Sequence, residues 1–313
     1  MTPARERKRW LMRGAFFALF VLAPPLDIFR LDLTLGHFIF FGMPWTLGLT
    51  AYQSGEITTL EATGRLLLRG FLPIAAVAGA LIWASWKYGR VYCGWLCPHF
   101  SVVETINGLM RRATGKPTLW EKTRLPARRA DGRVVAPDAR YGWLVAAAVL
   151  GFAFLWALTL LTYLLPPREI YHDLFMFSLT RNQTIFLGVA TTVFTVEFLA
   201  ARHLFCRFGC AVGAFQSIAW MANSRALVVR FDGARAAACA QCNAACDNDC
   251  PMRLKPRNVK RLKFTCTQCG QCVNACEAVQ RDNPRGSLLT WVAAEAAEAE
   301  RAPRRVSARV MEG

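Results

Sequence analysis

The stretch that decides how this chain is interpreted spans residues 239–276 and reads CAQCNAACDNDCPMRLKPRNVKRLKFTCTQCGQCVNAC. It contains eight of the twelve cysteines of the 313-residue chain, in two runs separated by a basic linker. The second run has the spacing C-x2-C-x2-C-x3-C. Three thiolates two residues apart can surround one small iron–sulfur cluster, while the fourth reaches a neighbouring cluster. The stretch therefore predicts a bacterial-ferredoxin-like module with two [4Fe–4S] clusters at residues 231–280.

Cross-ligation between the two runs predicts which cysteines hold each cluster. The predicted ligands of the first cluster are Cys239, Cys242, Cys246 and Cys276. The predicted ligands of the second cluster are Cys250, Cys266, Cys269 and Cys272. The first run departs from the usual spacing, because it reads C-x2-C-x3-C-x3-CP with one additional residue. Zinc sites are an alternative, but they usually pair short C-x2-C units without three closely spaced cysteines. Disulfides are another alternative, but they would need an oxidising compartment, which the orientation predicted below argues against.

The composition indicates a membrane protein. The chain is 54% hydrophobic and yet carries a formal net charge of +17. Apolar spans joined by basic loops explain this combination without a nucleic-acid partner. Apolar runs predict about four transmembrane helices, near residues 10–29, 66–86, 141–165 and 184–202. Glycines and a proline interrupt residues 33–52, which we expect to be interfacial or re-entrant. The predicted fold class is mainly α, with a polytopic membrane domain at 1–230, the two-cluster module at 231–280 and a tail at 281–313.

The charge distribution predicts the orientation. In residues 99–140 arginine and lysine far outnumber aspartate and glutamate, which is typical of cytoplasmic loops. Four spans place the N-terminus, this loop and the cysteine-rich module on one side. We therefore expect a multi-pass protein of a bacterial inner membrane, with its N-terminus and ferredoxin module in the cytoplasm. Arg13, in the first span, is expected to snorkel to the interface. The linker between the two cysteine runs carries five cations, which are expected to form a solvated face, a docking surface for an acidic partner or a contact with anionic lipids. They are Lys255, Arg257, Lys260, Arg261 and Lys263.

The four remaining cysteines form two C-x3-C pairs, each directly after a predicted span: Cys93, Cys97, Cys206 and Cys210. Each half of the membrane domain thus repeats a pair of spans followed by a cysteine pair. If the halves pack with pseudo-symmetry, the four thiols approach one another at the membrane edge. They could form a thiol relay, a copper site of soft thiolates or the ligands of a further cluster. The plainer alternative is four reduced cysteines at helix ends.

Five further residues are candidates for chemistry. Glu197 lies inside the last predicted span and could carry a proton or pair with a neighbouring arginine. His99 and His203 flank the cysteine pairs and could join a metal site there, or be interfacial histidines. His172 and Met176 are four residues apart, a spacing compatible with one helical face and a copper contact. No catalytic residue is assigned from the sequence.

Several short motifs together resemble one known group of proteins. They are RVYCGWLCP at residues 90–98, CRFGC at 206–210, AFQS at 214–217 and HFIFFGMPW at 37–45. Combined with the terminal cysteine runs, they resemble the membrane-bound polyferredoxins of the NapH, MauN and NosR type and of the FixG, RdxA and CcoG type. Two departures stand out. Ala211 occupies a position where the family usually has proline. The sequence also ends soon after the second run, as in a short form without the immunoglobulin-like domain of the FixG type.

The resemblance implies two functions. NapH-like members imply an electron-transfer component that passes electrons between cytoplasmic [4Fe–4S] clusters and a membrane or periplasmic redox partner, with quinol as one candidate. CcoG-like members imply copper handling, including Cu(II) reduction, by an assembly factor for a cytochrome oxidase. The implied cofactors are two [4Fe–4S] clusters, with copper or a further cluster at the membrane-edge cysteines.

Overall fold

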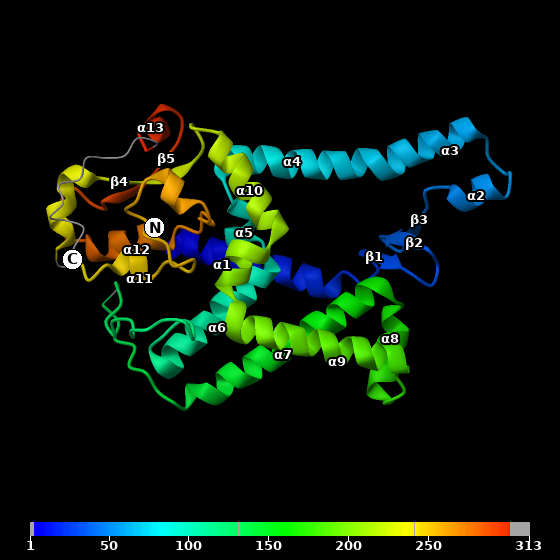
Figure 1. Cartoon of the computed structure of the whole chain (residues 1–313), viewed down its shortest axis with the longest axis horizontal. Coiled ribbons are helices and arrows are strands. Elements are labelled where there is room, and N and C mark those ends of the chain that lie inside the picture. The colour runs from blue at the N-terminus through cyan, green and yellow to red at the C-terminus, as the bar shows by residue number, and fades with distance from the viewer. Residues whose placement is uncertain (1–2, 131, 241, 301–313) are drawn as a thin grey trace. The chain divides into compact units, whose positions relative to one another are not determined.

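The computed structural model describes residues 3–130, 132–240 and 242–300, and it is mainly helical, as predicted (Figure 1). The last thirteen residues of the predicted tail lie outside the described residues. The chain divides into two compact units. We call the first the cysteine unit, because it contains all twelve cysteines; it comprises Met1–Gly14, Ile82–Ala148 and Phe198–Gly313. We call the second the span unit; it comprises Ala15–Leu81 and Val149–Glu197.

Among the residues that the structure describes, three helices are long and apolar enough to cross a membrane: Thr59–Tyr88, Tyr141–Leu164 and Arg181–Ala201. They overlap three of the four predicted spans. The first comprises α3 (Thr59–Arg65), the π-helical η1 (Leu66–Phe71) and α4 (Leu72–Tyr88). The second is α7 (Tyr141–Leu164), and the third joins α9 (Arg181–Val196) to the π-helical η2 (Glu197–Ala201). Capping boxes at Thr58 and Thr180 fix where the first and third helices begin.

The first predicted span corresponds to α1 (Pro3–Leu22), which is not one of these three candidates. The helix is continuous, but arginines and a lysine occupy its first half. It ends at Leu22 rather than near residue 29, because Pro24 and Pro25 follow and proline interrupts the helical hydrogen bonds. Within the span unit, Phe17 and Phe20 of α1 pack on Trp156 of α7. This half of α1 therefore lies beside a candidate span.

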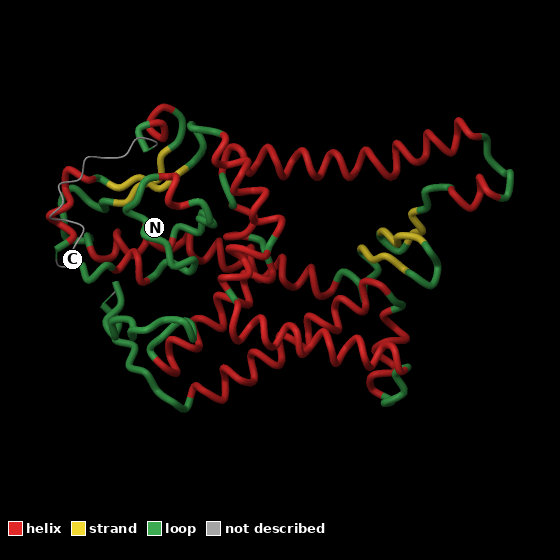
Figure 2. The backbone as a smooth tube through the Cα atoms, viewed as in Figure 1, coloured by secondary structure: helices red, strands yellow, loops and turns green. Residues whose placement is uncertain are grey.

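The segment that we expected to be interfacial or re-entrant is a small sheet (Figure 2). Its strands are β1 (Phe29–Asp32), β2 (His37–Phe40) and β3 (Met43–Trp45), paired antiparallel in that order. The short helix α2 (Leu49–Gln53) follows. The core of the span unit lies elsewhere, where α8 (Pro167–Phe175) packs with α7 and α9. Its buried residues are Ala157, Leu158, Leu161, Ile170 and Leu187.

The cysteine unit combines short helices with a two-stranded sheet. The paired cysteines are carried by α5 (Val91–Trp95), α6 (Pro98–Thr114), η3 (Phe205–Gly209) and α10 (Ala211–Ala222). Strands β4 (Val228–Phe231) and β5 (Leu289–Val292) pair antiparallel and enclose the C-terminal cysteine runs. Between them lie η4 (Gly233–Cys239), α11 (Ala245–Asn248), η5 (Lys260–Lys263) and α12 (Gln271–Val279), and α13 (Glu295–Glu298) follows β5.

Candidate iron–sulfur site

The C-terminal cysteines surround two separate cavities. The first cavity is lined by Cys239, Cys242, Cys246 and Cys276. The second is lined by Cys250, Cys266, Cys269 and Cys272. These are the two sets that cross-ligation between the runs predicts. A shared cavity shows where the sulfurs lie, and the assignment of each cysteine as a ligand stays a prediction. All twelve cysteines are free, so none is engaged in a disulfide.

The additional residue in the first run is absorbed by the backbone. Asn243 and Ala244 both adopt the left-handed region, with φ of 47° and 52°. This turn lies between Cys242 and the start of α11, so Cys246 still faces the first cavity. Left-handed backbone costs free energy in residues other than glycine, which indicates that the surrounding fold imposes the turn.

Helix α12 lies between the two cavities. Cys272 lines the second cavity and Cys276, one helical turn later, lines the first. Four residues of an α-helix advance about 6 Å along its axis. A core of Val229, Phe231, Val273, Leu288 and Leu289 packs with Cys246 and Cys272. The two cavities are therefore close neighbours in one apolar module.

Burial raises the pKa of several of these thiols. It raises the pKa of Cys239 to about 11, with further increases from the neighbouring Cys242 and Cys276. It raises the pKa of Cys250 to about 12 and that of Cys266 to about 11. Because the thiolate is the metal ligand, a bound iron atom takes the place of the thiol proton. The donor set, four sulfurs around each cavity, suits iron–sulfur ligation.

Two cations of the linker are structural, contrary to our expectation of an exposed basic face. Lys260 is 5% exposed and donates to the carbonyl oxygens of Trp220 at 3.0 Å and Asn223 at 2.5 Å. Lys263 is 2% exposed and donates to the carbonyl oxygen of Val229 at 2.5 Å. The sequence could not show this, because these three carbonyl groups lie more than thirty residues before the lysines that they bind.

The second cysteine of each C-x3-C pair, Cys93–Cys97 and Cys206–Cys210, precedes a helix; we call them the membrane-edge pairs after their predicted position. Cys97 is the N-cap residue of α6, and Cys210 is the N-cap residue of α10. The Cys210 sulfur accepts a hydrogen bond from the Gly213 N–H at 3.4 Å. Burial raises the pKa of Cys97 to about 11, while the N–H groups of Phe100 and His99 act in the opposite direction. Helix N-termini favour thiolates, and both sulfurs lie at such positions.

Two of these four cysteines, Cys97 and Cys206, pack with residues that line the second cavity. Phe100, Cys206, Met252 and Leu254 form a buried cluster. Cys97, Cys250 and Cys266 pack against that cluster. In addition, Gly94 lies close to the loop that carries Cys266 and Cys269, which we call the cysteine loop. An added Cβ at Gly94 would collide with the Thr267 carbonyl oxygen of this loop. The membrane-edge pairs and the second cavity are thus parts of one packed structure.

The other candidates fall in different places. His99 approaches Cys206, with 3.5 Å between Nδ1 and the sulfur. His203 is 6% exposed, and burial lowers its pKa to about 4, although Glu121 acts in the opposite direction. Glu197 begins η2, half-buried within the third candidate span. His172 and Met176 belong to the span unit, where the histidine lies 3.3 Å from Asp173 and the methionine is 65% exposed.

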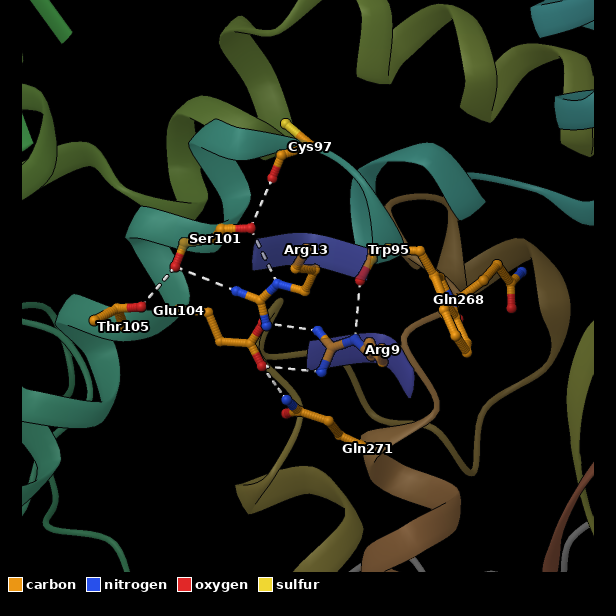
Figure 3. A network of polar contacts seen from close by, with 10 residues as sticks. Arg9, Arg13, Trp95, Cys97, Ser101, Glu104, Thr105, Gln268 and Gln271 are labelled. Carbon is orange, nitrogen blue, oxygen red and sulfur yellow. Dashed lines mark hydrogen bonds and ion pairs between the residues drawn. The ribbon is translucent and has the colours of Figure 1, made fainter. Parts of the chain in front are cut away.

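A buried ion-pair network was missed at the sequence level (Figure 3). Glu104 of α6 pairs with Arg9 at 2.7 Å and Arg13 at 2.5 Å, and it accepts a hydrogen bond from Gln271 of α12. Arg9 also donates to the Gly94 carbonyl oxygen at 2.9 Å. Both arginines are 3% exposed, so the expectation that Arg13 snorkels was wrong. The only signal in the sequence was the presence of arginines beside an apolar run.

Comparison with known protein families supports an iron–sulfur site. A 4Fe-4S binding domain matches residues 70–117, which include Cys93 and Cys97 but neither C-terminal run. No solved structure matches the chain.

Relatives with known names extend the match. The putative electron transport protein YccM of Escherichia coli is 23% identical over 76% of this chain and 58% of its own length. The methylamine utilization ferredoxin-type protein MauN of Methylorubrum extorquens is 29% identical over 57% of this chain and 55% of its own length. The chain thus spans little more than half the length of these two relatives. An uncharacterized protein of Methanocaldococcus jannaschii is 25% identical over 60% of this chain. Together the matches support a membrane-type polyferredoxin family and confirm the resemblance that the motifs indicated.

Proposed function

We propose that this protein is a membrane-anchored iron–sulfur electron-transfer component. In this proposal, two [4Fe–4S] clusters occupy the two cavities of the cysteine unit, with the cross-ligated sets as ligands. They exchange single electrons with a redox partner in the membrane through a third metal–sulfur centre at the membrane edge. The observation that carries the proposal is the arrangement of twelve free cysteines in one compact unit, eight of them around two cavities.

The arrangement supports transfer between the two cavities. Cys276 and Cys272 come from successive turns of α12 and line different cavities. An iron–sulfur cluster supplies reversible one-electron chemistry when it is bound. The chain's own contribution is to hold one cysteine of each set about 6 Å apart along the axis of α12 and to bury them among apolar side chains.

The packing also supports a third centre. Cys97 and Cys206 lie in the same buried cluster as Cys250 and Cys266, with Phe100 and Met252 among them. The matched 4Fe-4S binding domain covers Cys93 and Cys97, which favours iron over copper at these thiols. We therefore propose Cys93, Cys97, Cys206 and Cys210 as its ligands, with His99 beside Cys206. The oxidase-assembly alternative gains no support from the matched domain or from the names of the relatives.

Quinol is the membrane partner that we propose. Oxidation of a quinol releases two electrons and two protons, and one-electron centres take up the electrons singly. Glu197 lies inside a candidate span, and carboxylates in such positions usually have a function. We propose that it accepts a proton. The basic loop at residues 99–140 supports a cytoplasmic position for the cysteine unit in a bacterial inner membrane, with α1 as a fourth membrane element.

The test is the metal content and electron paramagnetic resonance (EPR) of protein purified from membranes without oxygen, before and after dithionite. Two cubane clusters give about eight irons per chain, and a third gives about twelve. A reducible signal with spin coupling between clusters would support the proposal. About two zinc ions and no reducible signal would refute it. Adding a quinol in place of dithionite tests whether quinol is the membrane partner. This part of the proposal is refuted if no cluster becomes reduced.

A further inference from the structure

Arg90 is a buried cation among the membrane-edge cysteines. It is 1% exposed. Its Nη2 donates to the Cys206 carbonyl oxygen at 2.9 Å and lies 3.7 Å from the Cys93 sulfur. Its Nε and Nη1 are also buried, and neither has a hydrogen-bond partner among the residues that the structure describes. Because a guanidinium stays charged in proteins, this site contains a permanent positive charge.

A buried positive charge needs a negative partner. Taking an ion out of water is unfavourable unless an opposite charge compensates for it. Within the described part of the chain, no carboxylate pairs with Arg90; its hydrogen bonds go to the Cys93 sulfur and the Cys206 carbonyl oxygen, and Gly213 lies beside it. Neutral thiols would leave the guanidinium uncompensated. Ionised sulfurs, as in a metal–thiolate centre, would compensate for it.

Helix α10, which follows the second half of the repeat, leaves space for the Arg90 side chain. An added Cβ at Gly213 would collide with Nη2 of Arg90 and would lie 2.9 Å from its Cζ. Gln216, on the same helix and fully buried, donates from Nε2 to the Cys93 sulfur at 3.6 Å. Arg90 and Cys206 are 116 residues apart in the sequence. The site is therefore built jointly by the segments that follow the two halves of the membrane domain.

We propose that Arg90 is the counter-ion of an anionic metal–thiolate centre at Cys93, Cys97, Cys206 and Cys210, and that it raises the reduction potential of this centre. The proposal rests on the third centre of the proposed function. A fixed positive charge in an apolar site stabilises the reduced form, which carries one more negative charge. Arg90 is thus a positioning residue that favours electron transfer to this centre.

The experiment compares three substitutions with one control, by iron content and an EPR-monitored redox titration. Arg90→Met removes the charge at similar length, and Arg90→Lys keeps it. Gly213→Ala leaves the arginine in the sequence but displaces its side chain. Arg230→Met, at an exposed position on β4, is the matched control. Arg90→Met and Gly213→Ala should lower the midpoint potential of one centre or lose about four irons per chain. Arg90→Lys should retain the iron, and the control should match the wild type.

The outcomes separate this inference from the proposed function. The inference is overturned if Arg90→Met and Gly213→Ala keep all iron and leave every midpoint potential unchanged. If Arg90→Met does not fold, the Gly213→Ala titration decides. If the wild type contains two reducible clusters and Cys93→Ser removes no iron, the third centre and this inference both fail, while the two-cluster proposal stands. If the wild type contains no reducible cluster, the proposed function itself fails.

Discussion

The contact between Gly94 and the cysteine loop gives the sharpest prediction. A Cβ at this position would collide with the Thr267 carbonyl oxygen and lie 3.3 Å from the Cys269 Cα. Both neighbours are backbone atoms, so no side chain can rotate away. Gly94→Ala must therefore displace either α5 or the loop that carries two cysteines of the second cavity.

The size of the effect follows from overpacking. Inserting a methyl group into a close-packed region costs about 1–3 kcal/mol. The change would also disturb the hydrogen bond from Arg9 to the Gly94 carbonyl oxygen, 2.9 Å long. Charge-assisted bonds of this kind contribute about 1.5–3 kcal/mol. We expect a destabilisation of about 2–4 kcal/mol and partial loss of iron from the second cavity.

A matched control is available on the neighbouring helix. Gly108 lies in α6, and an added Cβ there would have no atom within 4 Å. Gly108→Ala should leave iron content unchanged and stabilise the helix by about 0.5–1 kcal/mol. The assay is the thermal midpoint and iron per chain of both variants, purified without oxygen. Equal midpoints and equal iron in Gly94→Ala and Gly108→Ala would show that α5 does not contact the cysteine loop as described.

Three further predictions concern the same unit. Cys276→Ser and Cys272→Ser should each lose about four irons per chain but remove different EPR signals, whereas loss of the same signal would contradict cross-ligation. Arg13→Gln should destabilise the protein by about 1–3 kcal/mol; the loss is limited because Arg9 still pairs with Glu104. Arg140→Gln removes an exposed ion pair and should cost less than about 1 kcal/mol. Equal denaturation midpoints of the two variants would disprove this difference. Iron chelation should expose residues 231–280 to limited proteolysis, and an unchanged digestion pattern would show that the metal does not stabilise this segment.

The sequence could predict features that depend on residues near one another in the chain. The iron–sulfur character and the mainly helical fold follow from cysteine spacing and apolar runs, and both are supported by the matched domain and the structure. The ends of the second and third candidate helices lie within about three residues of the predicted limits, whereas the first begins at Thr59 instead of residue 66.

The errors involve partners distant in sequence. Arg13 was expected at the interface because its partner Glu104, 91 residues later, could not be identified from one sequence. Lys260 and Lys263 were expected to be exposed for the same reason. The Asn243–Ala244 turn was also unforeseeable, because neither residue type announces a left-handed backbone as reliably as glycine does. The ligand sets of the two clusters stay predictions.

The discontinuity of the cysteine unit has a consequence for biosynthesis. Its parts come from Met1–Gly14, Ile82–Ala148 and Phe198–Gly313, and Glu104 joins the first part to Gln271 in the last. Ribosomes add about 5–20 residues per second, so α12 emerges on the order of 10–50 s after the N-terminal helix. Throughout that interval Arg9 and Arg13 lack the surroundings that bury them. Cys272 and Cys276 of the two proposed ligand sets belong to α12, so in the proposed function the loading of both clusters would follow its synthesis, and iron insertion would be a late step in maturation.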